Sequence, residues 1–559
     1  MLIGIDVGGT YTDGVLFEDG SIIKDIKKPT GSDLQETLLL VLDELLQNRD
    51  QNTLERIVIS TTLVTNLLAT GQGDRTALML VPGRGLPASS YCICPDTYFL
   101  QGGVDFRGHI VENLDQEQLE TALEDIKDKG INKIAVACKF SNRNDSIEKT
   151  IRKFIKNKCP QMEVAIGCET AGKLNFIRRA VTTYYTAMTM SRWSQFVNDF
   201  EQALTRRNIN VQVEVLKADG GTMPLHNSIG TPCETVFSGP AASTMGGVAL
   251  TMDRKNSVVI DIGGTTSDIS LIIEGEPLYA SKGANIDNKF THINSFAVRS
   301  LALGGDSEVD IKNGCVFVEP NRKGDAACFG GPVPTVTDVF NFKYDLNIGD
   351  CSRSRSMLQE TAQNAGIELE SLCQQVVDTV IAKLQSLITT MFKEWENEPA
   401  YRVWEVVNRK KFQLDRIIGI GAAAQAIVPQ LAKSMNLEYL IHRYSPVANA
   451  LGACIARPTI AFNLHVDTQY QKYFIDYNGI SGSIANARNF QLQDARNLAL
   501  ENLNRLAEEK GMKNYASEAR FDREEQFNVI RGWDRAGKVY EISVQIAPGF
   551  INGFKGVKR

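Results

Sequence analysis

A repeated pattern, Asp-x-Gly-Gly-Thr-x-x-Asp, constrains the fold of this chain more than any other feature. It occurs at Asp6–Asp13 and again at Asp261–Asp268, each time directly after an apolar run typical of a strand. A second apolar or alternating run follows each pair of glycines, so we predict a strand–turn–strand unit for both copies. A dinucleotide-binding fingerprint or a P-loop needs a helix directly after its glycines, and neither copy offers one. Two such distant copies predict two homologous half-molecules.

The glycine turn of each copy has the composition of a phosphate-binding loop. Adjacent glycines permit positive φ and let consecutive backbone N–H groups approach an anion with no Cβ in the way. A single copy would be most simply an ordinary Gly-Gly hairpin turn, whereas two matching copies favour one nucleotide gripped between two halves. The residues predicted to contact the nucleotide are Gly8, Gly9, Thr10 and Thr12 in the first copy and Gly263, Gly264, Thr265 and Thr266 in the second.

The aspartates of the pattern predict a magnesium site. Asp6 and Asp261 end their strands, where a carboxylate repels phosphate but can hold a hydrated Mg²⁺ that neutralises it. Asp13 and Asp268 follow the turns, and two roles are open for them. Either one of them orients magnesium-bound waters or the attacking group, or each only accepts backbone hydrogen bonds in its hairpin. All four aspartates are therefore candidate catalytic residues, and Asp6 and Asp261 are the candidate metal ligands.

The repeated hairpin resembles those of the actin and sugar-kinase superfamily, and the wider sequence is similar to the hydantoinase A and 5-oxoprolinase family. The resemblance implies an α/β fold, with two actin-like ATPase half-domains and a nucleotide cleft between them. It also implies ATP and Mg²⁺ as cofactors, and ATP-driven opening of lactam or hydantoin rings. The segments that carry it are DVGGTYTD (6–13), STTLVTNLL (60–68), KADGGTM (217–223), FSGPAAS (237–243), DIGGTTSD (261–268), LGGDS (303–307), PTVTD (334–338) and IGIGAAAQAIVP (418–429).

Two later glycine turns complete the predicted nucleotide site. Gly304, Gly305 and Ser307 form the first, in which Asp306 stands where the family has a third glycine and Arg299 precedes it where the family more often has histidine. Aspartate tolerates positive φ, but its carboxylate either disfavours a phosphate or contacts a metal or substrate, which leaves the substrate open. The second follows a strand and precedes a helix, an arrangement that holds adenosine in this superfamily, although close helix–strand packing would select the same small residues. Its predicted contacts are Gly419, Gly421 and Ala422.

The chain is predicted to divide into an N-terminal half-domain at 1–178, a second half-domain at 179–462 and a small C-terminal α+β appendage at 463–559. A long helix over 179–204 is expected to cross between the halves, and the small-residue helix 447–456 is expected to act in hinge closure. One continuous helical region is expected over 355–398. In the appendage we expect an amphipathic helix over 489–510 and a hairpin with its turn at 534–537.

Composition restricts the classes of partner. The net charge of −6 argues against a nucleic-acid-binding face, and no apolar run approaches membrane-spanning length. The first motif begins at residue 6, and the 11 cysteines contain no C-x-x-C, so we expect no signal peptide, reduced thiols and a cytoplasmic location. The missing C-x-x-C also disfavours the superfamily's dehydratase activators, which hold an iron–sulfur cluster. The five histidines are dispersed and predict no transition-metal site.

The expected function is that of the A subunit of an ATP-dependent cyclic amide hydrolase. Phosphorylation of the lactam or hydantoin carbonyl oxygen would turn it into a leaving group and open the carbon to water. The paired turns and carboxylates support the phosphoryl-transfer half, whereas the cyclic amide comes from the resemblance alone. A hydantoinase B-type subunit is the expected partner, and a homo-oligomer is compatible with the sequence. The alternatives are a regulatory or carboxylase-associated ATPase of the superfamily and a small-molecule kinase, for which no carboxylate base is evident.

Overall fold

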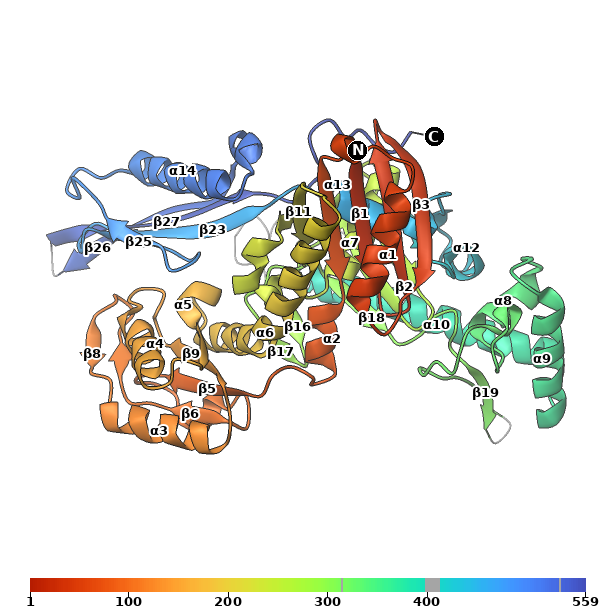
Figure 1. Ribbon diagram of the computed structural model, residues 1–559, viewed down its shortest axis with the longest axis horizontal. Helices are drawn as coiled ribbons and strands as arrows, with labels where there is room; N and C mark the ends of the chain where they lie inside the picture. The colour runs from red at the N-terminus through yellow and green to blue at the C-terminus, as the bar shows by residue number, and fades with distance from the viewer. Residues whose placement is uncertain (313–314, 398–412, 532–533, 559) are drawn as a thin grey trace.

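The computed structural model describes residues 1–312, 315–397, 413–531 and 534–558 (Figure 1). Its centre holds two six-stranded sheets, and each sheet contains one copy of the repeated hairpin. A four-stranded α/β module, orange in Figure 1, and a five-stranded C-terminal module, blue, extend from one side of this centre. Helices α8 and α9 extend from the opposite side. The predicted α/β class with two ATPase-like halves and a C-terminal appendage is confirmed.

The first sheet has the strand order β12-β11-β4-β1-β2-β3. β1 pairs antiparallel with β2, and β4 and β11 extend the sheet in parallel on the other side of β1. β11 and β12 follow residue 178 in the chain, so the segment 1–178 does not complete this sheet by itself. The strands are β1 (Leu2–Val7), β2 (Tyr11–Glu18), β3 (Ser21–Pro29), β4 (Arg56–Thr61), β11 (Gln212–Leu216) and β12 (Thr222–Pro224).

The second sheet repeats this arrangement, with the order β15-β14-β13-β21-β22 and β18 paired beside β14. β13 pairs antiparallel with β14 and parallel with β21, as β1 does with β2 and β4. The strand predicted before the last of the glycine turns is confirmed as β21. The strands are β13 (Ser257–Ile262), β14 (Ser267–Ile273), β15 (Glu276–Pro277), β18 (Val298–Leu301), β21 (Arg416–Ile420) and β22 (Glu438–Leu440), and the short pair β16 (Asn285–Ile286) and β17 (Lys289–Phe290) precedes β18.

Two helices pack against each other between the sheets. α13 (Ala448–Ile455) lies on β1, β2 and β4 of the first sheet, and α7 (Ser238–Thr251) lies on β13 and β14 of the second. A Cβ on Gly246 would lie 2.1 Å from the Ala448 carbonyl oxygen, and one on Gly452 would lie 2.1 Å from that of Ala242. The small residues of these helices therefore serve a packing in which the two backbones touch.

The outer face of the first sheet is covered by α1 (Leu34–Leu46) and the long helix α6 (Phe176–Arg206). Leu38, Leu42 and Trp193 from these helices pack with Ile3 and Ile5 of β1 in one buried cluster. α1 begins after Asp33, whose carboxylate accepts the N–H groups of Gln35 and Glu36 in the first turn. α6 also contacts β5 and β9 of the four-stranded module, so it joins that module to the first sheet.

The four-stranded module alternates strands and helices, as predicted. Its sheet has the order β10-β9-β5-β6 and is parallel throughout. Buried apolar residues of β5 and β9 pack against α3 and α4. Its elements, with the preceding helix α2 (Leu63–Ala69), are β5 (Thr76–Val81), β6 (Thr97–Phe99), β7 (Gly103–Val104), β8 (Ile110–Glu112), α3 (Gln116–Asp128), β9 (Lys133–Cys138), α4 (Ser146–Lys158), β10 (Glu163–Ile166) and α5 (Gly167–Thr170).

The helical insertion between β18 and β21 corrects one prediction. The single helical region expected over 355–398 is two helices, because Gly366 takes a left-handed conformation with φ of 66° and ends the first of them. Residue 398 lies outside the described residues. The elements here are β19 (Val309–Lys312), β20 (Cys315–Val318), α8 (Val336–Tyr344), α9 (Cys351–Ala365) and α10 (Leu369–Glu396), and α12 (Ala424–Met435) follows β21.

The C-terminal module is an antiparallel sheet, β25-β24-β23-β27-β26, with α14 packed on it. The turn predicted at 534–537 is wrong, since Arg535 and Gly537 pair with Ile530 and Val529 inside the ladder. After a register shift between Val529 and Ile530, Asp534 pairs with Arg531, so residues 534–537 belong to β27; residues 532–533 lie outside the described residues. The elements are β23 (Ile460–Asp467), β24 (Lys472–Ile475), β25 (Ser481–Ser483), α14 (Leu492–Glu509), β26 (Arg520–Arg531) and β27 (Asp534–Ile546).

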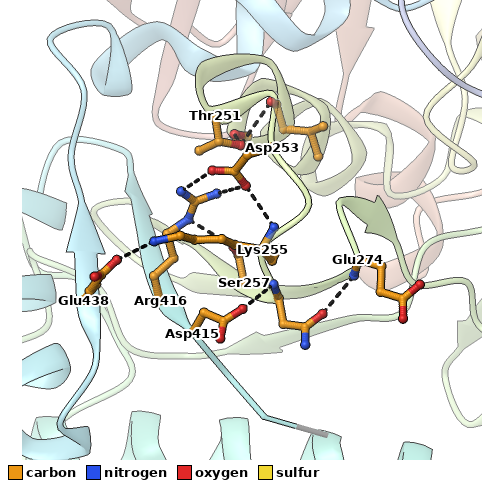
Figure 2. A network of polar contacts seen from close by, with 11 residues as sticks. Thr251, Asp253, Lys255, Ser257, Glu274, Asp415, Arg416 and Glu438 are labelled. Carbon is orange, nitrogen blue, oxygen red and sulfur yellow. Dashed lines mark hydrogen bonds and ion pairs between the residues drawn. The ribbon is translucent and has the colours of Figure 1, made fainter. Parts of the chain in front are cut away.

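A polar network fixes the end of the second sheet that lies away from the glycine turns (Figure 2). Arg416, at the start of β21, donates to both carboxylate oxygens of Asp253 at 2.7 Å and to Ser257 Oγ at 3.1 Å. Lys255 pairs with Glu438 of β22 at 2.7 Å. The bidentate Arg416–Asp253 pair thus joins the start of β21 to the loop before β13. This link helps to hold β13 and β21 in the register that positions Asp261.

None of the helices in the described parts of the chain is both long enough and apolar enough to span a membrane.

Candidate functional site

The two repeated hairpins have the same geometry. Asp6 lies opposite Asp13 in the β1–β2 ladder, and Asp261 lies opposite Asp268 in the β13–β14 ladder. Directly opposed residues of an antiparallel pair point to the same face, so each hairpin presents two carboxylates together. In both turns the first glycine closes the loop, with Gly8 N–H donating to Tyr11 and Gly263 N–H donating to Thr266, each at 3.0 Å.

The glycines of these turns do not adopt the positive φ that the sequence suggested. Gly8, Gly9, Gly263 and Gly264 are all absent from the residues with left-handed backbone. Close approach explains them better: a Cβ on Gly8 would lie 2.9 Å from the Tyr11 carbonyl oxygen, and one on Gly264 would lie 2.5 Å from Asp306 Oδ2. A Cβ on Gly9 would meet nothing within 4 Å, so this turn leaves open space where a ligand could approach the backbone.

The threonines of the two turns differ in their availability. Thr12 is buried, and its hydroxyl lies 3.0 Å from that of Thr30, which in turn donates to the Gly8 carbonyl. The buried Thr12 side chain therefore stabilises the first turn through its contact with Thr30. Thr10, Thr265 and Thr266 are partly exposed on the turns themselves.

The carboxylates of the two hairpins meet at Asn449 on α13. The Asn449 amide nitrogen donates to Asp6 Oδ2 and to Asp261 Oδ2, each at 3.2 Å. Ser243 of α7 also donates to Asp261 Oδ2, at 2.5 Å. Asp6 and Asp261, predicted as metal ligands from the two copies of the repeat, are thus brought together, and no local pattern in the sequence marks the asparagine that joins them.

Burial sets the protonation of all four aspartates. Asp6 and Asp13 are 4% exposed, and burial raises the pKa of each. The pKa of Asp13 reaches about 7, although Lys27 opposes the shift. Burial raises the pKa of Asp268 to about 7 as well, with smaller contributions from Asp261 and Asp6, and it raises the pKa of Asp261. Carboxylates so crowded favour a nearby cation.

Lys27 supplies a cation that sequence reasoning missed. It lies opposite Asp13 in the β2–β3 ladder, and its ammonium donates to Asp13 Oδ1 at 2.6 Å and to the Pro446 carbonyl at 3.1 Å. Its charge also acts on Asp6 and Asp261. In the sequence it lies in the run Lys24–Lys28, which looks like an ordinary solvated stretch; only the register of β3 distinguishes it.

The third glycine turn lies directly on the second hairpin. Gly305 and Asp306 donate their N–H groups to the carbonyls of Gly263 and Gly264 at 2.9 and 2.8 Å, and Ser307 Oγ accepts from Gly304 N–H at 2.9 Å. A Cβ on Gly304 would lie 2.4 Å from the Gly264 carbonyl oxygen, so only glycine fits there. The two turns therefore pack together as one unit, in which Gly304, Gly305 and Ser307 are buried and support the second hairpin.

The two departures from the family pattern have different surroundings. Arg322 Nε donates to Asp306 Oδ2 at 2.9 Å, so the carboxylate at the third-glycine position carries its own counter-ion. Burial raises the pKa of Asp306 while Arg322 opposes the shift. Arg299 on β18 instead pairs with Glu394 at 2.8 Å on the exposed surface. Asp306 is therefore part of the site, whereas the side chain of Arg299 is engaged on the surface.

The predicted adenosine segment contributes one close neighbour of the aspartates. Gly421 has φ of 84°, and a Cβ there would lie 2.5 Å from Asp261 Oδ1. Gly419 is buried, where a Cβ would meet Val428, Ile441 and Ala424 at 3.0 to 3.2 Å, so it serves the packing of β21 against α12. Ala422 is exposed beside them.

The donor set fits a magnesium ion. Asp6 Oδ1 and Asn449 Oδ1 are buried and have no hydrogen-bond partner among the described residues, which leaves two oxygen acceptors facing the site unsatisfied. Mg²⁺ binds through one or two carboxylates and keeps waters and substrate phosphates as its other ligands. No group of three or more His, Cys, Asp or Glu side chains in the described residues could hold a metal, so an all-protein cage is not what this site offers.

Comparison with known proteins identifies the family of this chain. A hydantoinase/oxoprolinase family model matches residues 179–461, and a model of the hydantoinase/oxoprolinase N-terminal region matches residues 2–159. The chain is 28% identical to the acetophenone carboxylase gamma subunit of Aromatoleum aromaticum over 60% of this chain and 52% of that subunit. It spans about half the length of such curated relatives.

Two solved structures share the fold over nearly the whole chain. Nucleotide-free acetone carboxylase superposes with a TM-score of 0.71 at 16% identity, over 99% of this chain and 88% of that one. The ATP-dependent caprolactamase of Pseudomonas jessenii superposes with a TM-score of 0.67, also at 16% identity, over 97% and 87%. Together with the family models, which cover both halves and the paired hairpins, these matches show that the chain belongs to the hydantoinase/oxoprolinase family.

Proposed function

We propose that this chain binds Mg²⁺·ATP between its two six-stranded sheets and transfers the terminal phosphoryl group to the carbonyl oxygen of a cyclic amide. The observation that carries the proposal is the convergence of the two hairpin carboxylates, Asp6 and Asp261, on Asn449. Phosphates between two such turns would meet backbone N–H groups from both sides. Family membership supports the reaction class, and the ATP-dependent caprolactamase that shares the fold supports the nucleotide.

Each side chain of the site has a role in this proposal. Asp6 and Asp261 would hold Mg²⁺, which would supply positive charge against the phosphates as charge shifts during transfer. The carboxylate of Asp13 is engaged by Lys27, so Asp268, with a pKa of about 7, is the better-placed group to orient water or accept a proton near neutral pH. The exposed threonines and the Gly9 turn would contact the phosphates.

Phosphorylation overcomes the low reactivity of the amide as an electrophile and of water as a nucleophile. The amide oxygen attacks the terminal phosphorus, its O–P bond forms, and the bond to the bridging oxygen breaks with ADP as the leaving group. The ring carbon then carries a phosphate ester in place of a carbonyl, so water can add to it. The ring C–N bond of this adduct breaks with the nitrogen leaving as a protonated amine, and hydrolysis of the remaining acyl phosphate gives a carboxylate and inorganic phosphate. Positioning and charge stabilisation supply the rate of the first step.

A ketone is the second candidate for the acceptor. The carboxylase gamma subunit among the relatives and the acetone carboxylase fold match favour it, because an enolate oxygen can take a phosphoryl group in the same way. The two candidates share the nucleotide site and differ only in the acceptor. A screen of lactams, hydantoins and ketones for stimulation of ADP release separates them, since only the true acceptor accelerates it.

The nucleotide half of the proposal is tested first. Calorimetry with ADP and with a non-hydrolysable ATP analogue, each with and without Mg²⁺, should show binding that depends on the metal. Absence of magnesium-dependent binding at millimolar nucleotide would overturn the proposal. Binding without stimulation by any carbonyl compound would instead favour a regulatory ATPase, in which the nucleotide drives closure and a partner senses it.

A further inference from the structure

A second enclosed site lies where three parts of the molecule meet. A cavity of about 90 Å³ is lined by residues that follow β10 in the four-stranded module, by the β11–β12 turn of the first sheet, and by residues that follow β24 and α14 in the C-terminal module. None of the four hairpin aspartates lines it. Figure 1 shows the orange and blue modules on the same side of the centre, with β11 at the junction.

The cavity walls come from modules in direct contact. A Cβ on Gly172 would lie 2.6 Å from the Asp476 Cα, so the segment after α5 touches the C-terminal module backbone to backbone. Arg143 of the four-stranded module also pairs with Glu541 of β27 at 3.2 Å. These contacts between the four-stranded module and the C-terminal module therefore hold the cavity walls in place.

The KADGGTM segment, which the nucleotide site does not use, shapes this cavity. Gly220 has φ of 80°, and a Cβ on it would lie 2.3 Å from the Phe296 ring, whereas one on Gly221 would lie 2.1 Å from Thr459. Glycine is required at both positions by this close packing. The turn so formed places the side chains of Lys217 and Asp219 in the cavity wall.

Almost every charge in the cavity wall has a partner. Lys217 Nζ lies 3.1 Å from Asp219 Oδ2 and 3.8 Å from Glu234 Oε2. Asp476 accepts from the backbone and side-chain nitrogens of Asn463, each at 2.6 Å. The remaining pairs are Glu169 with Arg152 at 2.6 Å and Lys173 with Asn294 at 2.8 Å.

Lys510 is the exception. It follows α14, and its ammonium lies 5.0 Å from the centre of the Tyr477 ring, but no carboxylate within 4.0 Å or hydrogen-bond acceptor accompanies it among the described residues. Burial lowers the pKa of Lys510, and the fields of Glu234 and Lys217 act on it in opposite directions. An ammonium held in a partly enclosed polar cavity without a counter-ion favours an anionic ligand.

We infer that this cavity binds a small carboxylic acid, with the carboxylate paired to Lys510 beside the Tyr477 ring. The other charged side chains of the wall have an ion-pair or hydrogen-bond partner, so a ligand with one carboxylate, placed at Lys510, is what this wall fits. A cavity of about 90 Å³ equals the liquid volume of roughly three water molecules, so it suits only a small acid such as propionate. The inference does not depend on the proposed reaction, because the site lies outside the hairpins and needs no nucleotide.

The test is calorimetric titration of the full-length chain, without nucleotide, using propionate and its uncharged isostere propionamide at constant ionic strength. We expect saturable binding of propionate. Propionamide should bind with an affinity lower by about tenfold or more. Lys510→Gln should lower propionate affinity by about tenfold or more, and Lys510→Arg should retain most of it. Lys513→Gln, which alters an exposed lysine three residues away that is paired with Glu508 at 2.8 Å, should leave it unchanged.

Two results would overturn the inference. One is the absence of saturable propionate binding up to tens of millimolar; the other is equal binding by the wild type and Lys510→Gln. Thermal unfolding of Lys510→Met checks the role of the lysine separately. A ligand-binding lysine without a counter-ion predicts a melting temperature equal to or above that of the wild type, whereas a marked decrease would show that Lys510 is a structural residue.

Discussion

Asp6 and Asp261 belong to different sheets, yet their Oδ2 atoms both lie 3.2 Å from one nitrogen, the side-chain amide of Asn449. Asn449 lies on α13, which packs on the first sheet and against α7 of the second. The spacing of the two hairpins is therefore coupled to the position of one helix. This geometry supports the predicted involvement of the segment 447–456 in hinge closure, which stays a prediction.

Replacement of the bridging amide should cost more stability in the absence of ligand than in its presence. Asn449→Ala removes the donor shared by the buried carboxylate of Asp6 and the half-buried carboxylate of Asp261, and loss of such hydrogen bonds costs about 1–3 kcal/mol. Mg²⁺ and nucleotide would compensate the same carboxylates, so saturating Mg²⁺·ADP should recover most of the loss. Chemical denaturation with and without Mg²⁺·ADP measures both values.

Asn502→Ala serves as the matched control for this experiment. Asn502 is also a buried asparagine, but it lies on α14 and donates to the Leu498 carbonyl at 2.8 Å. Its replacement should cost the same free energy of unfolding with and without Mg²⁺·ADP. An identical response of the two variants would contradict the proposed role of Asn449.

Asp261→Asn should reduce turnover much more than binding. The charge held by this carboxylate matters most where phosphoryl charge shifts in the transition state, so we expect kcat to fall by at least about tenfold more than nucleotide affinity. Steady-state ADP release and calorimetry give the two quantities. Asp253→Asn, which breaks the ion pair with Arg416 in Figure 2, should lower the melting temperature without this selective effect on kcat. An unchanged rate in Asp261→Asn would show that Asp261 is only structural.

The stability of the ligand-free protein should depend on the protonation of Asp268. Burial raises its folded pKa to about 7, above the ordinary aspartate value of 3.8, so the folded state binds the proton more tightly than the unfolded state. The contribution of this proton to stability is complete below the unfolded pKa and is lost as the pH rises toward 7. Asp268→Asn removes this loss, since asparagine does not titrate.

The variant should therefore gain stability relative to the wild type as the pH rises. At 1.36 kcal/mol for each unit of pKa shift, the gap should grow by at most about 2–3 kcal/mol between pH 5 and pH 8. Denaturant titrations at both pH values measure it, and Asp199→Asn, a surface aspartate on α6, is the control. A gap that stays constant with pH would show that Asp268 is not held in its protonated form.

The repeat made the local parts of the site predictable and left the long-range parts hidden. The strands and turns around Asp6 and Asp261 follow from apolar runs broken by glycines, a signal contained within a few residues. Lys27 and Asn449 reach the site only through the β2–β3 register and the packing of α13, which no short segment encodes. The addition of β11 and β12 to the first sheet is nonlocal for the same reason.

Glycine was also ambiguous in the sequence. Glycine permits both a positive φ and a close approach of neighbouring atoms to its Cα, and a sequence does not show which of the two a position needs. In the structure, Gly304 is required by the nearby Gly264 carbonyl, whereas Gly421 is required both by its positive φ and by the nearby Asp261 carboxylate. The turn of the C-terminal hairpin was misplaced because a register shift beside Ile530 draws Asp534–Gly537 into the ladder. Turn residues in a sequence do not reveal a bulge that moves the turn.

Arg322 should affect nucleotide binding through Asp306. Arg322→Ala would leave the buried Asp306 carboxylate uncompensated beside the glycine turns, so the Kd for ADP should rise by about tenfold. Asp306→Ala would remove one carboxylate and leave Arg322 paired with Asp325 alone, so the local charge becomes more favourable to the phosphates and the Kd for ADP should fall or stay the same. The double variant should lie near the wild type. Simple addition of the two single effects would show that the pair at 2.9 Å does not act as a unit.

The final prediction concerns ring opening. Hydrolysis of a phosphorylated amide needs a positioned water and a base or metal, and no group of three potential metal-binding side chains occurs in the described residues. Relatives of this chain are named as subunits, and it spans about half the length of curated relatives. We therefore expect the purified chain to release phosphate from ATP but to open a cyclic amide slowly or not at all without a hydantoinase B-type partner.

Parallel assays of phosphate release and ring-opened product, on the chain alone with its stimulating amide, provide the test. Phosphate release in large excess over product is the expected result, and a mass-spectrometric search for the phosphorylated amide should find it accumulating. Asp261→Asn, assayed beside it, should lose both phosphate release and the intermediate, which ties them to the hairpin site. Stoichiometric ring opening at the rate of ATP turnover would show instead that the water-activating groups lie within this chain, and Asp268, with its pKa of about 7, would be the first residue to replace.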